Sequence, residues 1–244
     1  MLFDTHAHLQ RKEFEKDLRE VIERARRNGI EFLINVGYDL ESSRSAVSMV
    51  GNGFYASVGY HPHDAKNFKE EVFELAEKAG VVAIGETGLD YYRDLSPREV
   101  QREIFIKQLA FAKDRNMPVI IHTRNAFEDL FPILEKFRPR GVLHAFSGDE
   151  GAVEKGLSLG LYFGIGGTVT FKNAKIREVV RSIPLDKIVL ETDSPFLTPH
   201  PWRGKRNEPA YLLRIAGELS SILGVPLEKL AEITTSNARE LFGI

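Results

Sequence analysis

The sequence predicts an α/β protein that folds as a single (β/α)8 TIM barrel. Eight short apolar segments, several of them rich in β-branched residues, alternate with amphipathic segments along the 244 residues. The apolar segments are hydrophobic on both faces, which is typical of strands that are covered on both sides in a parallel sheet. No linker rich in proline, glycine or serine interrupts this order, so we expect residues 1–244 to form one domain.

Each predicted strand is a short apolar run. We place the strands at Leu2–Thr5, Glu31–Val36, Phe54–Val58, Val81–Gly85, Pro118–Ile121, Gly141–Leu143, Leu161–Gly164 and Lys187–Leu190. The rival arrangement is an open doubly wound sheet, which a G-x-G-x-x-G motif after the first strand would favour, but the sequence has none there. The glycines of Gly164–Gly167 follow a late strand, and we interpret them as a tight turn.

The predicted helices carry apolar residues at helical spacing between the strands. We expect them at Glu13–Asn28, Leu40–Val50, Ala65–Ala79, Pro97–Arg115, Ala126–Phe137, Gly151–Leu159, Ala174–Ser182, Ala210–Leu223 and Leu227–Phe242. Gly29 and Gly80 end the first and third helices, as C-terminal glycines commonly do. Ser96 is expected to cap the fourth helix, with Pro97 in its first position and Glu99 in its third.

The composition is that of an ordinary globular protein, with 43% hydrophobic and 28% charged residues. The absence of cysteine excludes disulfides, thiolate catalysis and cysteine-ligated zinc or iron–sulfur sites. No apolar run is long enough to span a membrane, and Asp4 and His6 come too early for a signal peptide, so we expect a cytoplasmic protein. The net charge of −2 provides no general attraction for nucleic acid, so the positive charge of any polyanion site must be local.

Six of the seven histidines stand at the ends of predicted strands, the seventh lies in the loop after the last strand, and none is expected in a helix. They are His6 and His8 after the first strand, His61 and His63 after the third, His122 and His144 at the ends of the fifth and sixth, and His200 after the eighth. Because a barrel carries its chemistry at the carboxyl ends of its strands, this sorting favours a metal site over scattered histidines. Residues two apart in extended backbone point to one side, so His6 and His8 can reach one ion. Taken alone, this pair fits two buried, hydrogen-bonded histidines equally well.

Two carboxylates join the histidines at the strand ends. Glu86 closes the fourth strand and Asp193 follows the eighth, with an exposed turn residue as the alternative for Glu86 and a cap or turn for Asp193. The candidate metal ligands are therefore His6, His8, Glu86, His122, His144 and Asp193. Six ligands exceed the number that one catalytic ion uses, which indicates two divalent ions with Glu86 as the bridge. Such ligands suit Zn²⁺, Mn²⁺, Fe²⁺ or Ni²⁺ and disfavour Mg²⁺, although the choice among Zn²⁺, Mn²⁺, Ni²⁺ and Mg²⁺ stays open.

Seven motifs occur in the right order to suggest a family. They are Asp4–His8, Gly59–His63, Gly85–Tyr91, Val119–Arg124, His144–Gly148, Leu190–Pro195 and Arg203–Pro209. On these motifs the chain resembles the TatD-related deoxyribonucleases, a branch of the amidohydrolase-like metal-dependent hydrolases. The resemblance implies a (β/α)8 barrel, metals at the six candidate ligands and metal-dependent phosphodiester hydrolysis, often as a DNA exonuclease. Many amidohydrolase relatives carry a modified lysine at strand 4, so Glu86 favours the TatD branch over dihydroorotase-like enzymes.

We therefore expect a hydrolase that cleaves DNA, single-stranded or at frayed ends, from the 3′ end. Metal-bound water would attack the phosphodiester, with Asp193 as metal ligand and general base and Glu86 as the bridging catalytic carboxylate. The second hypothesis is a metal-dependent hydrolase of a small ester, amide or lactone. The third is a metal-binding partner protein without turnover, which only an activity assay separates from the first two.

The expected substrate contacts lie around this site. His61 is expected to touch the substrate or the leaving group, or to hydrogen-bond within the mouth of the barrel, and Arg124 is expected to meet a phosphate or to pair with a surface carboxylate. In the loop after the eighth strand, Arg203, Lys205 and Arg206 are expected to hold phosphates, with Trp202 as a face for a base. The alternative for this loop is a solvated turn or ion pairs with Glu208 and Glu191. Asp90 is expected to orient a ligand or the Gly88 turn, and neither His63 nor His200 receives a firm role.

Overall fold

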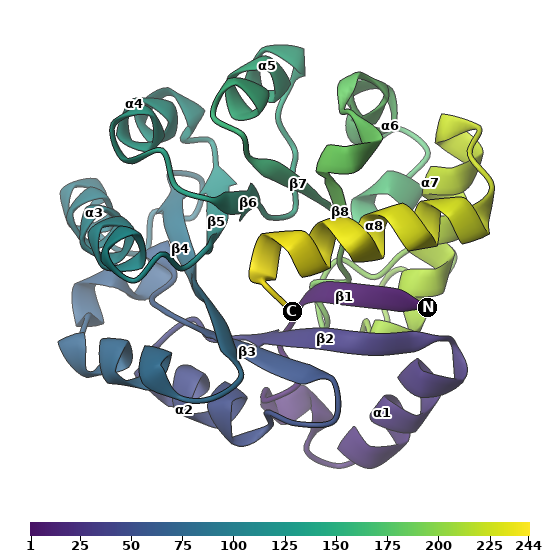
Figure 1. Ribbon diagram of the computed structural model, residues 1–244, viewed down its shortest axis with the longest axis horizontal. Coiled ribbons are helices and arrows are strands. Elements are labelled where there is room, and N and C mark those ends of the chain that lie inside the picture. The colour runs from purple at the N-terminus through teal and green to yellow at the C-terminus, as the bar shows by residue number, and fades with distance from the viewer.

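All eight predicted strands are present in the computed structural model, which describes residues 1–244 (Figure 1). The strands are β1 (Leu2–Ala7), β2 (Ile30–Val36), β3 (Phe54–Val58), β4 (Val81–Asp90), β5 (Val119–Arg124), β6 (Gly141–Leu143), β7 (Tyr162–Ile165) and β8 (Ile188–Leu190). They form one parallel sheet in the order β1 to β8, with helices between them. The α/β barrel expected from the sequence is therefore confirmed.

The barrel closes between β1 and the segment that follows β8. Ala7 forms an isolated parallel bridge with Ser194. The backbone N–H of His8 donates to the Ser194 carbonyl at 2.8 Å, and that of Asp193 donates to the His6 carbonyl at 2.8 Å. The seam of the barrel therefore runs directly between candidate ligands from the two ends of the chain.

Four strands extend beyond their predicted ends: β7 gains Ile165, and the other three take in candidate ligands. β1 continues to Ala7, β4 to Asp90 and β5 to Arg124, which places His6, Glu86 and His122 within the ladder. The predicted ends of β1, β4 and β5 lie where apolar residues give way to polar ones. These polar side chains face one another instead of water, so the ladder continues through them.

The helices agree with the predicted order, with shorter bounds in several cases. They are α1 (Leu18–Arg27), α2 (Leu40–Ser48), α3 (Arg98–Asp114), α4 (Phe127–Phe137), α5 (Glu150–Ser158), α6 (Ile176–Val179), α7 (Leu212–Leu223) and α8 (Leu227–Phe242). In place of the expected helix at Ala65–Ala79 the chain forms two 3₁₀ helices, Pro62–Asn67 and Glu70–Glu77. The backbone becomes extended at Phe68, and the centroid of the Phe68 ring lies 5.1 Å from that of the Tyr60 ring. The expectation that no histidine lies in a helix is therefore wrong for His63.

Two predicted roles of small residues are also wrong. Pro97 caps α3, and the Ser96 hydroxyl instead donates to the His63 carbonyl at 2.7 Å and accepts from the Lys66 N–H at 3.2 Å. Ser96 therefore links the segment before α3 to the 3₁₀ helix Pro62–Asn67. The Gly164–Gly167 segment is not a tight turn, because Gly164 lies inside β7 and Gly167 begins a 3₁₀ helix (Gly167–Thr170).

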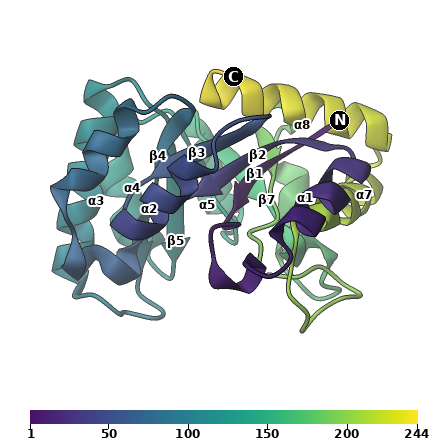
Figure 2. The same ribbon diagram turned by 90° about the horizontal axis from the view of Figure 1, so that it is seen from below.

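The core has two main parts that leave one end of the barrel for chemistry. The larger cluster of 42 buried residues packs the strands against the outer helices. A second cluster, with Phe3, Ile34 and Val189 from the strands, includes Leu241 and Phe242 of α8. Figure 2 shows α8 along one edge of the molecule and the loops that follow the strands at the opposite edge. α8 therefore covers the amino-terminal end of the barrel, and the polar strand ends lie away from it.

No single helix is long and apolar enough to cross a membrane. The segments Pro209–Leu223 and Leu227–Phe242, which are bent by 110° relative to each other, meet the length and composition test only as a pair.

Candidate metal centre

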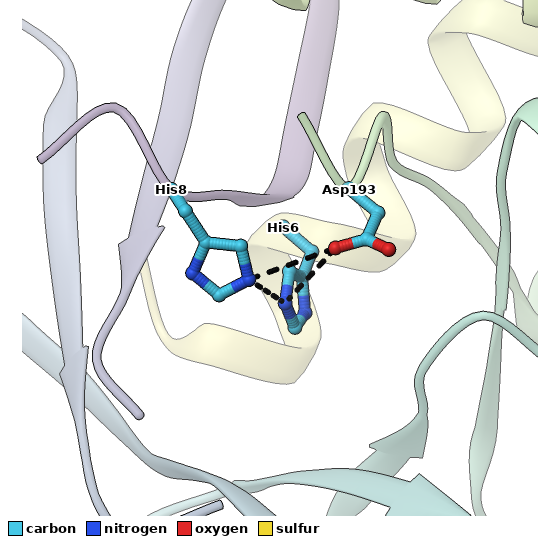
Figure 3. A group of neighbouring side chains, drawn as sticks. All are labelled: His6, His8 and Asp193. Carbon is cyan, nitrogen blue, oxygen red and sulfur yellow. Dashed lines mark hydrogen bonds and ion pairs between the residues drawn. The ribbon is translucent and has the colours of Figure 1, made fainter. Parts of the chain in front are cut away.

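The imidazoles of His6 and His8 converge at the end of β1. Their Nε2 atoms lie 3.1 Å apart, and both side chains are buried. The Nδ1 atom of His8 donates to the Val36 carbonyl at 2.7 Å, which leaves its Nε2 lone pair directed at His6. Figure 3 shows the two rings meeting beside Asp193, whose Oδ1 lies 3.8 Å from His6 Nε2 and 3.6 Å from His8 Nε2. Three donor atoms therefore face one point.

The backbone holds Asp193 in an uncommon conformation. Its φ of 55° lies in the left-handed region, which aspartate tolerates better than most residues. The Asp193 carbonyl accepts from the Phe196 N–H at 2.8 Å, which continues the turn. Burial raises the pKa of Asp193, but the nearby imidazoles of His8, His144 and His6 outweigh it and lower the pKa, so the carboxyl is ionised.

Asp4 anchors the same loop from the strand side. Its carboxylate accepts from the Thr192 backbone N–H at 2.9 Å and from the Thr192 hydroxyl at 2.6 Å. Complete burial raises the pKa of Asp4 to about 7, against the effect of these hydrogen bonds. Thr192 directly precedes Asp193, so Asp4 fixes the start of the turn that carries Asp193.

Glu86 lies between two groups of histidines. Its Oε2 atom is 3.4 Å from His6 Nε2 and 3.7 Å from His8 Nε2. Its Oε1 atom faces three further ring nitrogens, at 2.9 Å from His122 Nδ1 and 3.5 Å each from His144 Nε2 and His61 Nε2. Burial raises the pKa of Glu86, but the surrounding imidazoles outweigh burial and hold it well below its ordinary value. One carboxylate thus shares its two oxygens between two sets of nitrogen atoms.

His144 stacks on His6, with ring centroids 3.6 Å apart. Its Nδ1 atom lies 3.0 Å from Glu191 Oε1, which leaves Nε2 for Glu86. Burial lowers the pKa of His144, but the carboxylates of Glu191 and Glu86 outweigh burial and raise it to about 10. Without a cation between them, His144 and Glu86 therefore form an ion pair at neutral pH.

Asp90 contacts two histidines at the end of β4. Its Oδ2 atom accepts from His63 Nε2 at 2.8 Å and lies 3.3 Å from His122 Nε2, while Oδ1 accepts from the backbone N–H groups of Tyr92 and Arg93. Burial raises the pKa of Asp90, but these hydrogen bonds outweigh it and lower the pKa, so Asp90 is an anion. With Nε2 directed at Asp90, His122 presents Nδ1 to Glu86.

His61 is held as a neutral ring. Its Nδ1 atom accepts from the His63 backbone N–H at 3.1 Å, so its proton sits on Nε2 and points toward Glu86. Burial is the main reason that the pKa of His61 lies well below its ordinary value. In this tautomer His61 offers a hydrogen-bond donor to the site.

The three cations of the loop after β8 differ in whether a carboxylate pairs with them. Arg206 is paired with Asp17, at 2.6 Å for each of two contacts, and lies 3.8 Å from Glu208. Arg203 and Lys205 are exposed and have no carboxylate within 4.0 Å, and the Arg203 guanidinium lies 4.2 Å over the Phe171 ring. Arg203 and Lys205 are therefore the cations of this loop whose charge is not paired.

Three other residues considered as substrate contacts or left without a role also touch the protein itself. Trp202 stacks on Tyr211 with ring centroids 4.5 Å apart, so one of its faces is covered. Arg124 is exposed at the end of β5 and lies 3.8 Å over the Tyr92 ring, with no carboxylate partner. The backbone N–H of His200 donates to the Thr170 hydroxyl at 2.8 Å, which ties the loops after β7 and β8 together.

Sequence reasoning missed two buried carboxylates, Asp4 and Glu191. The alternative prediction that Glu191 pairs with the loop cations is wrong, because Glu191 lies buried against His144. The signal was available, since Glu191 follows an apolar strand directly, as Glu86 does. Asp4 interrupts the apolar run of β1, and its partner Thr192 lies 188 residues away, which no local pattern reveals.

The donor set fits divalent cations. Three groups of donor atoms, each within 4.8 Å, are present: His6, His8 and Asp193; His6, Glu86 and His144; and His61, Glu86 and His122. The His6 and His8 Nε2 atoms could not approach as two lone pairs without a proton or cation between them. Burial, and then the charge of His144, lower the pKa of His6, which favours the neutral form that binds metals. Nitrogen with carboxylate oxygen suits Zn²⁺, Mn²⁺ or Ni²⁺ better than Mg²⁺.

The comparisons with known proteins agree with this geometry. The family model described as TatD related DNase matches residues 3–243. The Bacillus subtilis (strain 168) protein named "Uncharacterized metal-dependent hydrolase YabD" is 45% identical over 254 residues, covering 100% of each chain. The Klebsiella pneumoniae (strain 342) protein named "3'-5' ssDNA/RNA exonuclease TatD" is 38% identical, covering 100% of this chain and 98% of the relative.

Solved structures show the same relationship. The crystal structure of YJJV, a TatD homologue from Escherichia coli K12, has a TM-score of 0.93 at 30% identity and covers 100% of this chain and 98% of its own. A dihydroorotase matches at a TM-score of 0.67 and 17% identity, covering 99% of this chain and 69% of that enzyme, which shows a shared barrel fold only. The chain belongs to the TatD-related DNase family of metal-dependent hydrolases.

Proposed function

We propose that the protein hydrolyses phosphodiester bonds in single-stranded DNA, or in frayed ends, from the 3′ end. The support is the family, the name of the Klebsiella relative and one observation of the site. That observation is the buried Glu86 carboxylate, with one oxygen toward His6 and His8 and the other toward His122 and His144. This arrangement suits a two-cation centre of the kind that serves phosphoryl chemistry.

Glu86 would be shared by two divalent ions. His6, His8 and Asp193 would complete the ligands of one ion, and His122 and His144 those of the other. Such ions, when bound, acidify a water molecule and offset the negative charge that develops on the phosphate. Asp90 holds the His122 ring by its other nitrogen, and the Val36 carbonyl does the same for His8.

Asp193 is the candidate general base. It is ionised, and its Oδ1 atom is the oxygen that faces His6 and His8. Oδ2 can therefore take the proton of the attacking water. The left-handed backbone of Asp193 and the tie from Asp4 to Thr192 hold this carboxylate in place.

His61 and the exposed cations are the candidate substrate contacts. The Nε2–H group of His61 is positioned to donate to a phosphate oxygen near Glu86. Arg203 and Lys205 carry unpaired charge on the loop after β8, and Arg124 does so at the end of β5. We leave Arg206 out of this set, because its guanidinium is held by Asp17.

The experiment is a substrate comparison with purified, metal-loaded protein. A 5′-labelled single-stranded oligonucleotide should shorten stepwise from its 3′ end, and a blunt duplex of the same sequence should be cut more slowly. The same assay is run with RNA, p-nitrophenyl esters and a lactone as alternative substrates. Turnover of the ester or lactone without release of nucleotides would replace the nuclease by the small-molecule hydrolase. Release of internal fragments would replace the exonuclease by an endonuclease.

The Glu86→Gln variant is the control for this comparison. It keeps the size of the side chain and removes the charge that the histidines surround. Nuclease activity that persists at the wild-type level in Glu86→Gln would assign the activity to a contaminant or to another site.

A further inference from the structure

Glu191 is a buried carboxylate that the proposed reaction does not use. It directly follows β8, and only 1% of its surface is exposed. Its Oε1 atom accepts from the Ala145 backbone N–H at 2.6 Å and lies 3.0 Å from His144 Nδ1. His144 is its only ion-pair partner. A carboxylate at this depth is costly unless it is paired, and its pairing here is entirely with His144 and the residue beside it.

The neighbouring strand is shaped around this carboxylate. Gly164 of β7 pairs with Val189 of β8, and a Cβ atom built on Gly164 would overlap Glu191 Oε2. The φ angle of Gly164 is not in the left-handed region, so alanine is excluded there by space and not by backbone conformation. Gly166 differs, because a Cβ atom there would meet the nearest atoms of Glu191 at 3.5 Å, an ordinary contact distance.

We propose that Glu191 is a positioning residue for His144 and that Gly164 is glycine in order to leave room for its carboxylate. The Glu191 carboxylate lies 3.0 Å from Nδ1 of His144 and attracts the proton of that nitrogen, so Nε2 is the ring nitrogen directed at Glu86. The stack of His144 on His6 fixes the plane of the ring, and Glu191 fixes its rotation within that plane. This inference rests on the proposed metal centre, in which Nε2 of His144 holds the second ion.

Glu191 lies behind His144 and not among the proposed ligands. It is 1% exposed and its polar contacts are His144 Nδ1 and the Ala145 N–H, so its effect must pass through these groups. It also holds the Ala145 N–H, whose residue has a φ of 44°, so that the chain turns directly after His144. Loss of this carboxylate should therefore weaken one metal position and spare the other, which His6, His8 and Asp193 form.

The test is a double-mutant cycle read by Zn²⁺ binding to the metal-stripped protein. Wild type should bind two ions. Glu191→Ala should weaken the binding of the second ion by about 10–100-fold, the usual effect of losing a carboxylate behind a histidine ligand. The affinity for the first ion should not change. Gly164→Ala should produce a similar loss, because its methyl group displaces the carboxylate. The double variant should bind the second ion no more weakly than Glu191→Ala alone, because without the carboxylate the methyl group introduced at position 164 has nothing to displace.

Two further variants separate positioning from general damage. Gly166→Ala, the matched control, should bind both ions as wild type does. Glu191→Gln keeps an oxygen for the Ala145 and His144 N–H groups and should bind the second ion with an affinity between those of wild type and Glu191→Ala. Thermal melting of each variant confirms folding. If Glu191→Ala does not fold, the single variants Glu191→Gln and Gly164→Ala provide the test.

The outcomes are distinct. A wild-type protein that binds no Zn²⁺ would overturn the proposed metal centre and this inference together. A wild type with two ions and a Gly164→Ala variant with unchanged affinity would overturn the inference alone. Additive losses in the double variant, or equal weakening of both ions, would also overturn it, because the effect would then be structural.

Discussion

Glu86 is the residue on which the proposed site depends most. Both oxygens of its buried carboxylate face imidazoles, and those imidazoles hold its pKa well below the ordinary value. We expect Glu86→Gln to lose at least one of two bound ions and most of the activity, because the neutral amide cannot bridge two cations. Metal analysis by mass spectrometry after dialysis checks this. Full metal content together with full activity would make the bridging role wrong.

Asp193 provides a second test at the level of single residues. Asp193→Asn keeps the shape of the side chain and removes the base, so kcat should fall by about 10²-fold or more while DNA binding persists. Kinetics and binding to the same oligonucleotide separate the two effects. Near-normal kcat with weak binding would instead make Asp193 a substrate contact.

The histidines predict how metal affinity depends on pH. In the metal-free protein the pKa of His144 is raised to about 10 and that of His122 is raised too, so at pH 7 His144 carries a proton that an ion must displace. Affinity should therefore increase with pH up to about 10, by roughly tenfold per unit for each displaced proton. Calorimetry in buffers of different ionisation enthalpy measures the proton release. Binding with no proton release would contradict the ion pair between His144 and Glu86.

At the scale of secondary structure, the sequence located the strands and helices well but not their ends. The apolar runs are present as strands, and their polar ends continue because Glu86 pairs with both His6 and His122 across the barrel. That pairing joins residues far apart in the chain, so a local pattern does not reveal it. The same holds for the 3₁₀ helices at Pro62–Asn67 and Glu70–Glu77, which the packing of Phe68 interrupts.

The loop after β8 supports a prediction about nucleic-acid binding. Arg203 and Lys205 are exposed and unpaired, so replacing both by alanine should weaken DNA binding and reduce the salt slope by about 0.7 for each lost phosphate contact. Metal content and turnover of bis-p-nitrophenyl phosphate should be retained. Salt titrations of oligonucleotide binding provide the measurement.

Arg206 is the matched control in the same loop. Its ion pair with Asp17 is partly exposed, so Arg206→Ala should lower stability by at most about 1 kcal/mol and leave the salt slope unchanged. A salt slope that falls in Arg206→Ala and not in the double variant of Arg203 and Lys205 would reverse the assignment of these residues.

At the scale of the whole molecule, the candidate centre joins both sides of the barrel. His6, His8 and Asp193 lie at the seam between β1 and the segment after β8, and Glu86, His122 and His144 come from β4 to β6. Bound ions would tie these strands together and should stabilise the fold, by about 2.7 kcal/mol at an ion concentration 100 times Kd. Chelation should therefore lower Tm in wild type and have less effect in Glu86→Gln, and equal effects in both would contradict this.

The sequence also revealed most of the candidate site, for a physical reason. Parallel strands of a barrel bring their carboxyl ends together, so the order of polar residues along the chain becomes a ring in space. This is why His6, Glu86, His122, His144 and Asp193 could be grouped from the sequence. Asp4 could not, because its partner Thr192 lies 188 residues away. Glu191 follows an apolar strand as Glu86 does, but only the contacts in the structure show that it acts on His144 and Ala145.

The central claim is that two ions held around Glu86 are required for cleavage of a DNA strand. The most direct measurement is a titration of metal-stripped protein with Mn²⁺ or Zn²⁺, in which bound ions per chain and release of 3′ nucleotides are recorded together. The account predicts little activity with one ion and full activity as the second ion binds, with neither effect in Glu86→Gln. Full nuclease activity in protein with no detectable metal, or a maximum reached at one ion per chain, would contradict it.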